Sequence, residues 1–139
     1  MDDRRILQEL SRHEALRLLA GVAMGRVVFT QRALPAIRPV NHILDNGDVI
    51  IRTNLASSVA ANVDRRPGTV VAYEADVIDP DTRTGWSVVV TGVAHLVDNP
   101  RDQARYEALL RPWVSNPADC VLRIRPDIVT GFRLTPQPA

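Results

Sequence analysis

The feature that most limits the fold is the Asn46-Gly47 pair, which lies between two strand-like runs at 35–44 and 49–53. Asn-Gly readily adopts the left-handed backbone angles that a two-residue hairpin turn requires. A third apolar run at 26–31 precedes these two, and Gln-Arg-Ala-Leu at 31–34 is typical of the turn that connects them. The sequence therefore predicts an antiparallel three-stranded meander.

The rest of the chain adds helices at the edges and more strands. Ser11 and Glu14 have capping-box spacing, which predicts a helix that ends at Gly21. A second helix is expected from Asn54 to about residue 66, and a third is predicted at the Asn99-Pro100 pair. Further strand-like runs cover 69–79, 86–97, 120–126 and 129–134. We expect a mainly β fold, a barrel of six or seven antiparallel strands with two or three peripheral helices, forming one domain over 1–139.

Composition excludes several classes of function. The net charge is +1, so no broad basic surface for nucleic acid or anionic lipid is expected. All 17 basic residues are arginine, which excludes a Schiff-base lysine. Cys120 is the single cysteine, so an intramolecular disulfide is impossible. The charged N-terminus has no apolar signal region and no run approaches the roughly 20 apolar residues of a membrane span, so we expect a cytoplasmic protein.

The run 86–93 is apolar at positions that face both sides of a strand. Strands that are buried on both faces are unusual in so short a chain, which favours packing against a second subunit. The alternative is that a helix of the same chain covers one of the two faces.

Small polar residues follow the strand at 49–53. Thr53, Asn54, Ser57 and Ser58 would lie at the start of the second helix, where backbone N–H groups and the helix dipole favour phosphate. Arg38 and Arg52 are the nearest candidates for contacts with that charge. The alternative is that these residues form an ordinary helix cap.

Three motifs in the same order point to a family. Arg38 and Val40 form an Arg-x-Val strand, Thr53, Asn54 and Ser57 form a Thr-Asn-x-x-Ser core, and the strand 88–92 ends in Val-x-Gly. Together with the order of elements over 11–134, they resemble the pyridoxamine 5′-phosphate oxidase-like superfamily of FMN-binding split barrels. The resemblance is greatest to its short bacterial branch, which includes nitroimidazole-resistance reductases.

The resemblance implies an FMN cofactor held at the interface of a homodimer. It also implies an oxidoreductase that passes electrons from a nicotinamide donor to a small-molecule acceptor, with no obligatory catalytic residue. The predicted cofactor-binding residues are Arg38, Pro39, Val40, Asn41, His42, Arg52, Thr53, Asn54, Ser57, Ser58, Trp86 and Ser87.

The sequence also departs from the family pattern. Ser58 and Val59 occupy the positions where the family often has Arg-Lys, and Ser87 stands where a glutamine usually contacts the flavin ring. We therefore expect Arg38 and Arg52 to carry more of the phosphate charge. The chain also ends without the Trp/Arg segment of true pyridoxamine phosphate oxidases, so oxidation of pyridoxamine phosphate is not expected.

Several alternatives remain open at this point. His42 either donates a hydrogen bond to the flavin or has a structural role. The cofactor is either FMN or, alternatively, a deazaflavin coenzyme or haem, and the protein either turns over or binds flavin passively. No metal site is predicted, because the three histidines lack ligand spacing.

Overall fold

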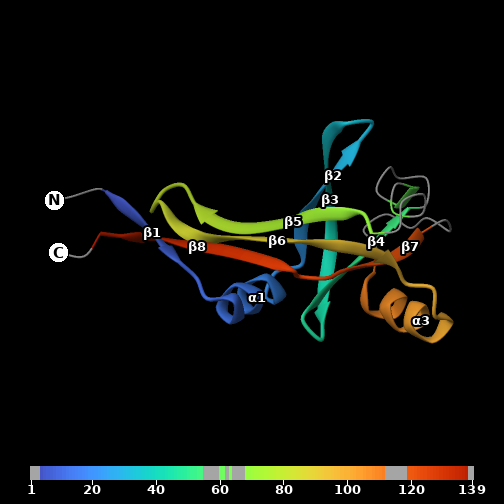
Figure 1. Ribbon diagram of the computed structural model, residues 1–139. Helices are drawn as coiled ribbons and strands as arrows, with labels where there is room; N and C mark the ends of the chain where they lie inside the picture. Colours follow the sequence, from blue (N-terminus) through green and yellow to red (C-terminus); the bar gives the residue numbers. More distant parts are fainter. Residues whose placement is uncertain (1–3, 55–59, 62, 64–67, 112–118, 138–139) are drawn as a thin grey trace.

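A computed structural model describes the chain except residues 1–3, 55–59, 62, 64–67, 112–118 and 138–139 (Figure 1). Within these limits the fold is an eight-stranded antiparallel sheet with two bounded helices. The elements in chain order are β1 (Arg5–Glu9), α1 (Arg12–Ala20), β2 (Met24–Gln31), β3 (Leu34–Asp45), β4 (Asp48–Asn54), β5 (Val70–Asp79), β6 (Thr84–Leu96), α3 (Pro100–Leu109), β7 (Asp119–Ile124) and β8 (Ile128–Pro136). Ala60, Ala61 and Val63 are also helical, within the stretch where the sequence predicts the second helix.

The sheet closes into a barrel because β6 has two partners on the same side. Its first part pairs with β8, from Gly85 to Thr91, and its last part pairs with β7, from Ala94 to Leu96. Strands β6, β5, β2, β3, β4 and β7 therefore form a closed ring, while β8 and β1 extend the sheet beyond it. Figure 1 shows this extension on the left, where β1 and β8 run side by side.

Gly92 marks the point where β6 changes partner. A Cβ atom there would collide with the Arg125 carbonyl oxygen, so only glycine allows the β7–β8 connection to cross so closely. Arg125 N donates to the Val93 carbonyl at 3.0 Å, and Val93 N donates to the Asp127 carboxylate at 3.4 Å. These bonds satisfy backbone groups of β6 between the two ladders.

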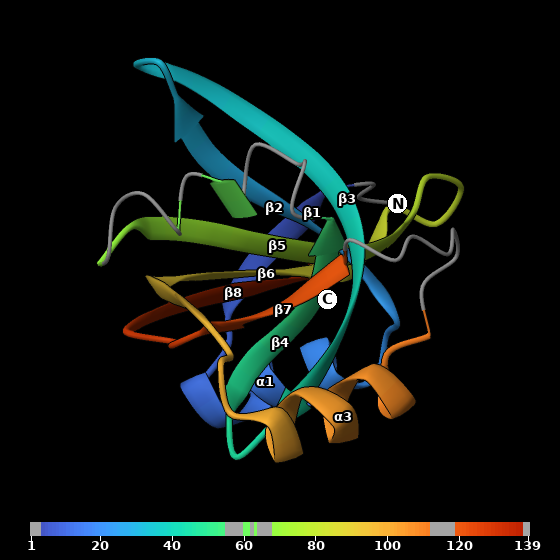
Figure 2. The same cartoon turned by 90° about the vertical axis from the view of Figure 1, so that its right-hand side faces the viewer.

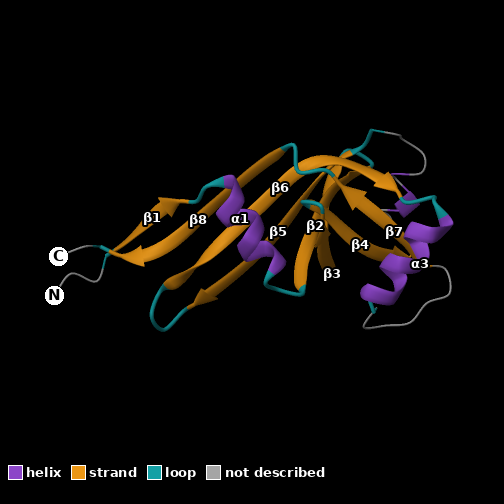
Figure 3. Cartoon of the chain, turned by 90° about the horizontal axis from the view of Figure 1, so that it is seen from below, coloured by secondary structure: helices purple, strands orange, loops and turns teal. Residues whose placement is uncertain are grey.

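Both bounded helices begin where their caps predict. Ser11 accepts a hydrogen bond from Glu14 N at 3.1 Å, and Gly21 ends α1. Asn99 accepts from the N–H groups of Arg101 and Asp102 at 2.9 and 3.2 Å, at the start of α3. Figure 3 shows α1 lying across the sheet and α3 at the far end, beside β4 and β7.

The structure confirms the mainly β split-barrel class and corrects the strand count to eight. Both predicted hairpin turns are present, with positive φ angles of 52° at Asn46 and 83° at Gly47. The strand absent from the prediction is β1, whose mostly exposed residues carry no strand alternation and pair only with the distant β8. Pairing so far apart in the chain leaves no local signal.

Two apolar clusters make up the core. The larger one fills the barrel beneath α1 and includes Leu19, Val27, Tyr73 and Val88. The smaller one lies between the barrel and α3 and contains Ile50, Val97, Tyr106, Leu110 and Val121. Alternate residues of β4 therefore contribute to different clusters, as the alternation of side chains along a strand requires.

Candidate functional site: a split between β3 and β4

The barrel wall opens between β3 and β4. Their ladder runs from the pair Asp45–Asp48 to the pair His42–Ile51 and then ends. From Asn41 backwards β3 pairs with β2, whereas from Arg52 onwards β4 pairs only with β7 among the described strands. Figure 2 shows β3 rising with β2 away from β4. The predicted cofactor residues of both strands lie along this opening.

Side chains on the two strands alternate between the barrel interior and the outside. Val40 and His42 belong with the inward set, since Val40 packs against the barrel core and His42 is only 4% exposed. Ile43 packs on the smaller cluster beneath α3, which places Asn41 on the outward face by alternation. Neighbouring residues that the sequence groups into one site therefore face opposite ways.

His42 is held by two partners inside the barrel. Its Nε2 lies 2.9 Å from the Leu19 carbonyl oxygen, and its Nδ1 lies 2.5 Å from the Tyr73 hydroxyl. A carbonyl can only accept, so Nε2 carries the hydrogen and Nδ1 accepts from Tyr73. Burial lowers the pKa of His42, and the hydrogen bond to Leu19 opposes this only in part. This arrangement favours the structural role among the two alternatives for His42.

Tyr73 of β5 contacts β3 at both His42 and Val40 and is itself closely packed. Its hydroxyl also lies 3.2 Å from the Val40 carbonyl oxygen, and burial raises the pKa of the phenol. A Cβ atom at Gly25 would lie 2.5–2.6 Å from the Tyr73 ring, so glycine is needed for this close approach. Tyr73 is not among the residues predicted from the sequence, although an aromatic residue at an inward position of a strand is a signal for such a role.

Arg52 and Asn41 both contact the end of α3. One terminal nitrogen of Arg52 donates to the carbonyl oxygens of Glu107 and Leu110 at 3.2 and 3.1 Å. The Asn41 amide donates to the Arg111 carbonyl oxygen at 3.0 Å. Both of these predicted cofactor residues therefore have an intramolecular role at the split.

Arg38 and Pro39 lie on the exposed arm that β2 and β3 form. Arg38 is exposed, donates to the Ile37 carbonyl oxygen at 3.0 Å, and its guanidinium lies 5.9 Å from the centre of the Phe29 ring. Among the described strands, β3 between residues 34 and 41 pairs only with β2. The other edge of this part of β3 presents backbone groups to whatever lies in the split.

Trp86 and Ser87 lie on opposite faces of β6. Trp86 packs against the barrel core, whereas Ser87 is directly across from Asp76 on the outward face. Phe132 of β8 flanks Ser87 on its other side and is 39% exposed. A single ligand on the outward face would therefore meet Ser87 but not the Trp86 side chain.

The predicted phosphate residues are described only in part. Thr53 is half-buried and pairs with Cys120 of β7, and Asn54 pairs with Asp119 at the end of β4. Ser57 and Ser58 lie outside the described residues. Cys120 itself is half-buried, so it is less enclosed than a core position.

An outward cluster of charges escaped the sequence analysis. Arg26 of β2 is directly opposite both Pro39 and Glu74, and its guanidinium lies 3.2 Å from Glu74 and 3.8 Å from Asp76. Burial, together with the neighbouring Asp76, raises the pKa of Glu74 to about 7. The period-two spacing of Glu74 and Asp76 was the available signal, because it places both carboxyls on one face.

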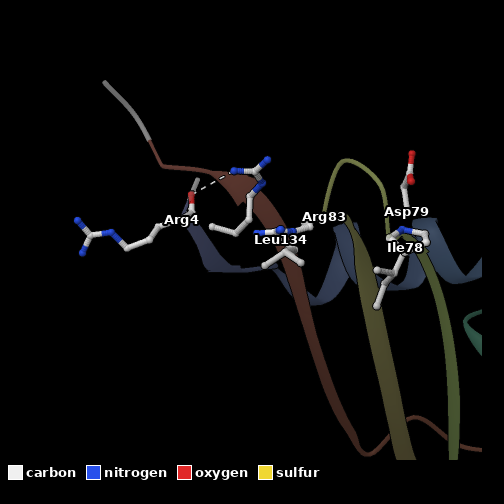
Figure 4. Close-up of a pocket in the computed structure, with 7 residues that line it drawn as sticks. Arg4, Ile78, Asp79, Arg83 and Leu134 are labelled. Atoms are coloured by element: carbon white, nitrogen blue, oxygen red, sulfur yellow. Dashed lines mark hydrogen bonds between the residues drawn. The ribbon is translucent and has the colours of Figure 1, made fainter. Parts of the chain in front are cut away.

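Two hollows lie away from the split. The larger, about 660 Å³, lies at the tip of the β5–β6 hairpin and includes Arg4, Ile78 and Leu134 in its lining. Figure 4 shows the Arg4 side chain extending away from Ile78 and Asp79. The smaller, about 390 Å³, lies between α1 and the turn at Gly47. Neither hollow contains a predicted cofactor residue.

The described residues also limit other kinds of site. No group of three His, Cys, Asp or Glu side chains in this part of the chain could hold a metal ion. None of the helices in the described ranges is long and apolar enough to cross a membrane.

Comparison with known proteins assigns the family. A model of the pyridoxamine 5′-phosphate oxidase family matches residues 11–133, which include both bounded helices and the split. The chain belongs to this family. The resemblance inferred from the three motifs is thereby confirmed.

Individual members of the family are similar over nearly the whole chain. The uncharacterized protein Rv0080 of Mycobacterium tuberculosis is 58% identical over 132 residues, which are 94% of this chain and 87% of that protein. A candidate pyridoxamine 5′-phosphate oxidase from Corynebacterium glutamicum is 32% identical, with a TM-score of 0.79, over 94% of this chain and 100% of the other. The FAD binding protein of Mycobacterium smegmatis is 31% identical, with a TM-score of 0.71, over 91% and 97% of the two chains.

Proposed function

We propose that this protein is a flavin-dependent oxidoreductase that binds FMN and passes electrons from a nicotinamide donor to a small-molecule acceptor. Membership of the pyridoxamine 5′-phosphate oxidase family carries the proposal. The FAD binding protein of M. smegmatis supports a flavin as the class of cofactor. The barrel also opens where the sequence motifs predict the cofactor, between β3 and β4.

The residues around the split fit a flavin in two respects. The edge of β3 that no described strand pairs with offers backbone groups to a planar ring, and the exposed Arg38 offers a cation to a phosphate. Thr53 and Asn54, with Ser57 and Ser58, would hold the phosphate, and Ser87 would lie against the ring. A bound flavin would supply the redox chemistry by accepting hydride and releasing electrons.

The chain's own residues would bind and orient the cofactor. The hydrogen bonds from His42 to Leu19 and from Tyr73 to His42 hold β3 from inside the barrel, so β3 presents a fixed edge to the split. Burial keeps His42 neutral, and both of its nitrogens are engaged, so it would not serve as a proton donor to the ring. We propose no obligatory acid or base.

We further propose a homodimer, formed through the outward face of β6 and β8, that works in the cytoplasm. Helix α1 packs on the inward side of β6 and β8, and no described helix covers the outward side. Ile128 and Phe132 are 60% and 39% exposed there, and Phe132 is adjacent to Ser87. An apolar surface beside a cofactor residue suits an interface that completes the cofactor site.

Anaerobic reduction tests the enzymatic part of the proposal. The FMN-loaded protein would be mixed with NADH or NADPH in the absence of oxygen, and the visible flavin absorbance would be followed. We expect bleaching by at least one donor and recovery of the colour on addition of a small acceptor such as a nitroimidazole or a quinone. A protein that binds FMN but is bleached by neither donor is a passive flavin-binding module.

A further inference from the structure

We propose that Arg52 and Asn41 are positioning residues that latch the carboxyl end of α3 into the split between β3 and β4. Arg52 thus acts on the cofactor site by holding its wall and not by contacting the phosphate. The effect on flavin rests on the proposed function, whereas the latch is a property of the chain alone.

Arg52 supplies a positive charge at the last turn of α3, where the helix has no basic residue. The last carbonyl groups of a helix have no partners within it and carry partial negative charge, so a positive side chain stabilises them. The last turn of α3 contains no basic residue of its own. Arg52 reaches it from β4, and one of its terminal nitrogens donates to the carbonyls of both Glu107 and Leu110.

Asn41 holds the next carbonyl from the opposite strand. Its amide donates to Arg111 at 3.0 Å, one residue beyond the Leu110 carbonyl that Arg52 binds. Asn41 and Arg52 would be the next cross-strand pair after His42 and Ile51, but there the β3–β4 ladder has ended. The end of α3 therefore joins the two strands where their own hydrogen bonding stops.

The rest of α3 is anchored independently. The Tyr106 hydroxyl donates to Asp45 at 2.5 Å and accepts from Arg123 at 2.7 Å, while Arg105 binds Asp45 at 2.9 Å. Tyr106 and Leu110 are also buried in the smaller apolar cluster. Loss of the Arg52 side chain should therefore loosen the last turn of α3 and leave the barrel folded.

The latch predicts a specific pattern of flavin binding. If Arg52 contacted the phosphate, its removal would weaken FMN but not riboflavin, which lacks the phosphate. If Arg52 positions the end of α3, its removal lets β3 and β4 shift at the split, and both flavins lose affinity alike. Removal of the Asn41 side chain should weaken both flavins in the same way but by less, because Asn41 makes a single, uncharged hydrogen bond.

Hydrogen exchange tests the latch without any flavin. Amide exchange of the peptide spanning residues 106–111 would be compared in the wild-type protein, Arg52→Ala and Asn41→Ala. We expect exchange about tenfold faster in Arg52→Ala, which corresponds to about 1.4 kcal/mol, and a smaller increase in Asn41→Ala. Arg101→Ala is the matched control, since it removes an exposed arginine from the opposite end of α3 and should change nothing.

Flavin titration then tests the consequence for the site. Dissociation constants of FMN and riboflavin would be measured for the same variants, and Arg52→Ala should weaken both by the same factor. Unchanged exchange in Arg52→Ala would overturn the latch, and so would a loss confined to FMN. If the wild-type protein binds neither flavin, the proposed function fails, while the exchange experiment still decides the latch.

Discussion

The two faces of β3 differ in how completely residues of the same chain cover their side chains and supply their hydrogen-bond partners. On the inward face, His42 has protein partners for both ring nitrogens, and Tyr73 closes the network. On the outward face, Asn41 bonds to the end of α3, and Pro39 and Ile37 are exposed. At His42 the inward face has all its hydrogen-bond partners within the chain, so this histidine serves the fold. The outward face of β3, and the edge that no described strand pairs with, are where a ligand or second subunit would add contacts.

The largest effect should come from breaking the inward network. His42→Ala leaves the Tyr73 hydroxyl and the Leu19 carbonyl without this partner and creates a cavity, so we expect a loss of about 2–4 kcal/mol in the free energy of unfolding. Urea denaturation would measure this loss. Asn41→Ala, one residue away, should cost less than about 1.5 kcal/mol. Equal losses in the two variants would contradict the difference between the faces.

A smaller loss is expected from crowding the same network. Gly25→Ala places a Cβ atom against the Tyr73 ring, and overpacking of this kind costs about 1–3 kcal/mol. Thermal unfolding would show the loss as a lower Tm. Gly21→Ala is the control, since its Cβ atom would lie 3.4 and 3.8 Å from the Leu18 and Arg17 carbonyl oxygens, at ordinary contact distance, and its φ is negative. A Gly25→Ala protein as stable as Gly21→Ala would show that Tyr73 is not held tightly.

A substitution on the outward face should weaken the association of the two subunits rather than the folding of each. Phe132→Glu puts a charge beside Ser87 on the proposed interface, so we expect the dimer dissociation constant to rise at least about tenfold. Sedimentation velocity would measure it, while the unfolding of the monomer should change little. Leu109→Glu, at an exposed site on α3, is the matched control. A Phe132→Glu protein that associates like the wild type would place the interface elsewhere.

The smallest effects should be those of pH on the free energy of unfolding, where Glu74 and His42 act in opposite directions. The raised pKa of Glu74 favours its protonated form in the fold, so its contribution is complete below about pH 4.5 and is lost as the pH rises towards 7. The lowered pKa of His42 acts oppositely, and stability falls as the pH drops below 6.5.

Stability measured between pH 5 and 8 separates these two groups. Glu74→Gln should remove the loss towards pH 7, by less than about 1 kcal/mol, because Glu74 and Asp76 are only half-buried and their partner Arg26 is exposed to solvent. The loss on the acid side should persist in that variant. If Glu74→Gln leaves the whole pH profile unchanged, the pKa of Glu74 is not raised in the folded protein.

The features that the sequence predicted correctly are those that depend on a few neighbouring residues. Ser11 and Asn99 cap their helices, and Asn46-Gly47 forms its hairpin, because each depends on a few adjacent residues. The motifs around Arg38 and Thr53 lie on β3 and β4, the two strands that border the split, and their role in binding a cofactor stays a prediction. Alternation along β3 would also have separated Asn41 from His42.

Other features depend on contacts between distant parts of the chain. Strand β1 exists because β8 accepts it, and nothing within 5–9 indicates that pairing. The role of Arg52 at α3 depends on how the helix packs across β4, so the sequence pointed only to its charge. Burial and the neighbouring Asp76 raise the pKa of Glu74 while Arg26 opposes them, and all three act only in the folded sheet.

The visible absorption spectrum of the purified protein, recorded before and after addition of FMN and removal of excess cofactor, tests the central claim most directly. We expect two flavin bands that stay with the protein, and their loss on substitution of Thr53 and Asn54 by alanine. A protein that stays colourless after incubation with FMN would contradict the flavin assignment. A spectrum that instead responds to haem or to a deazaflavin coenzyme would assign the split to that cofactor.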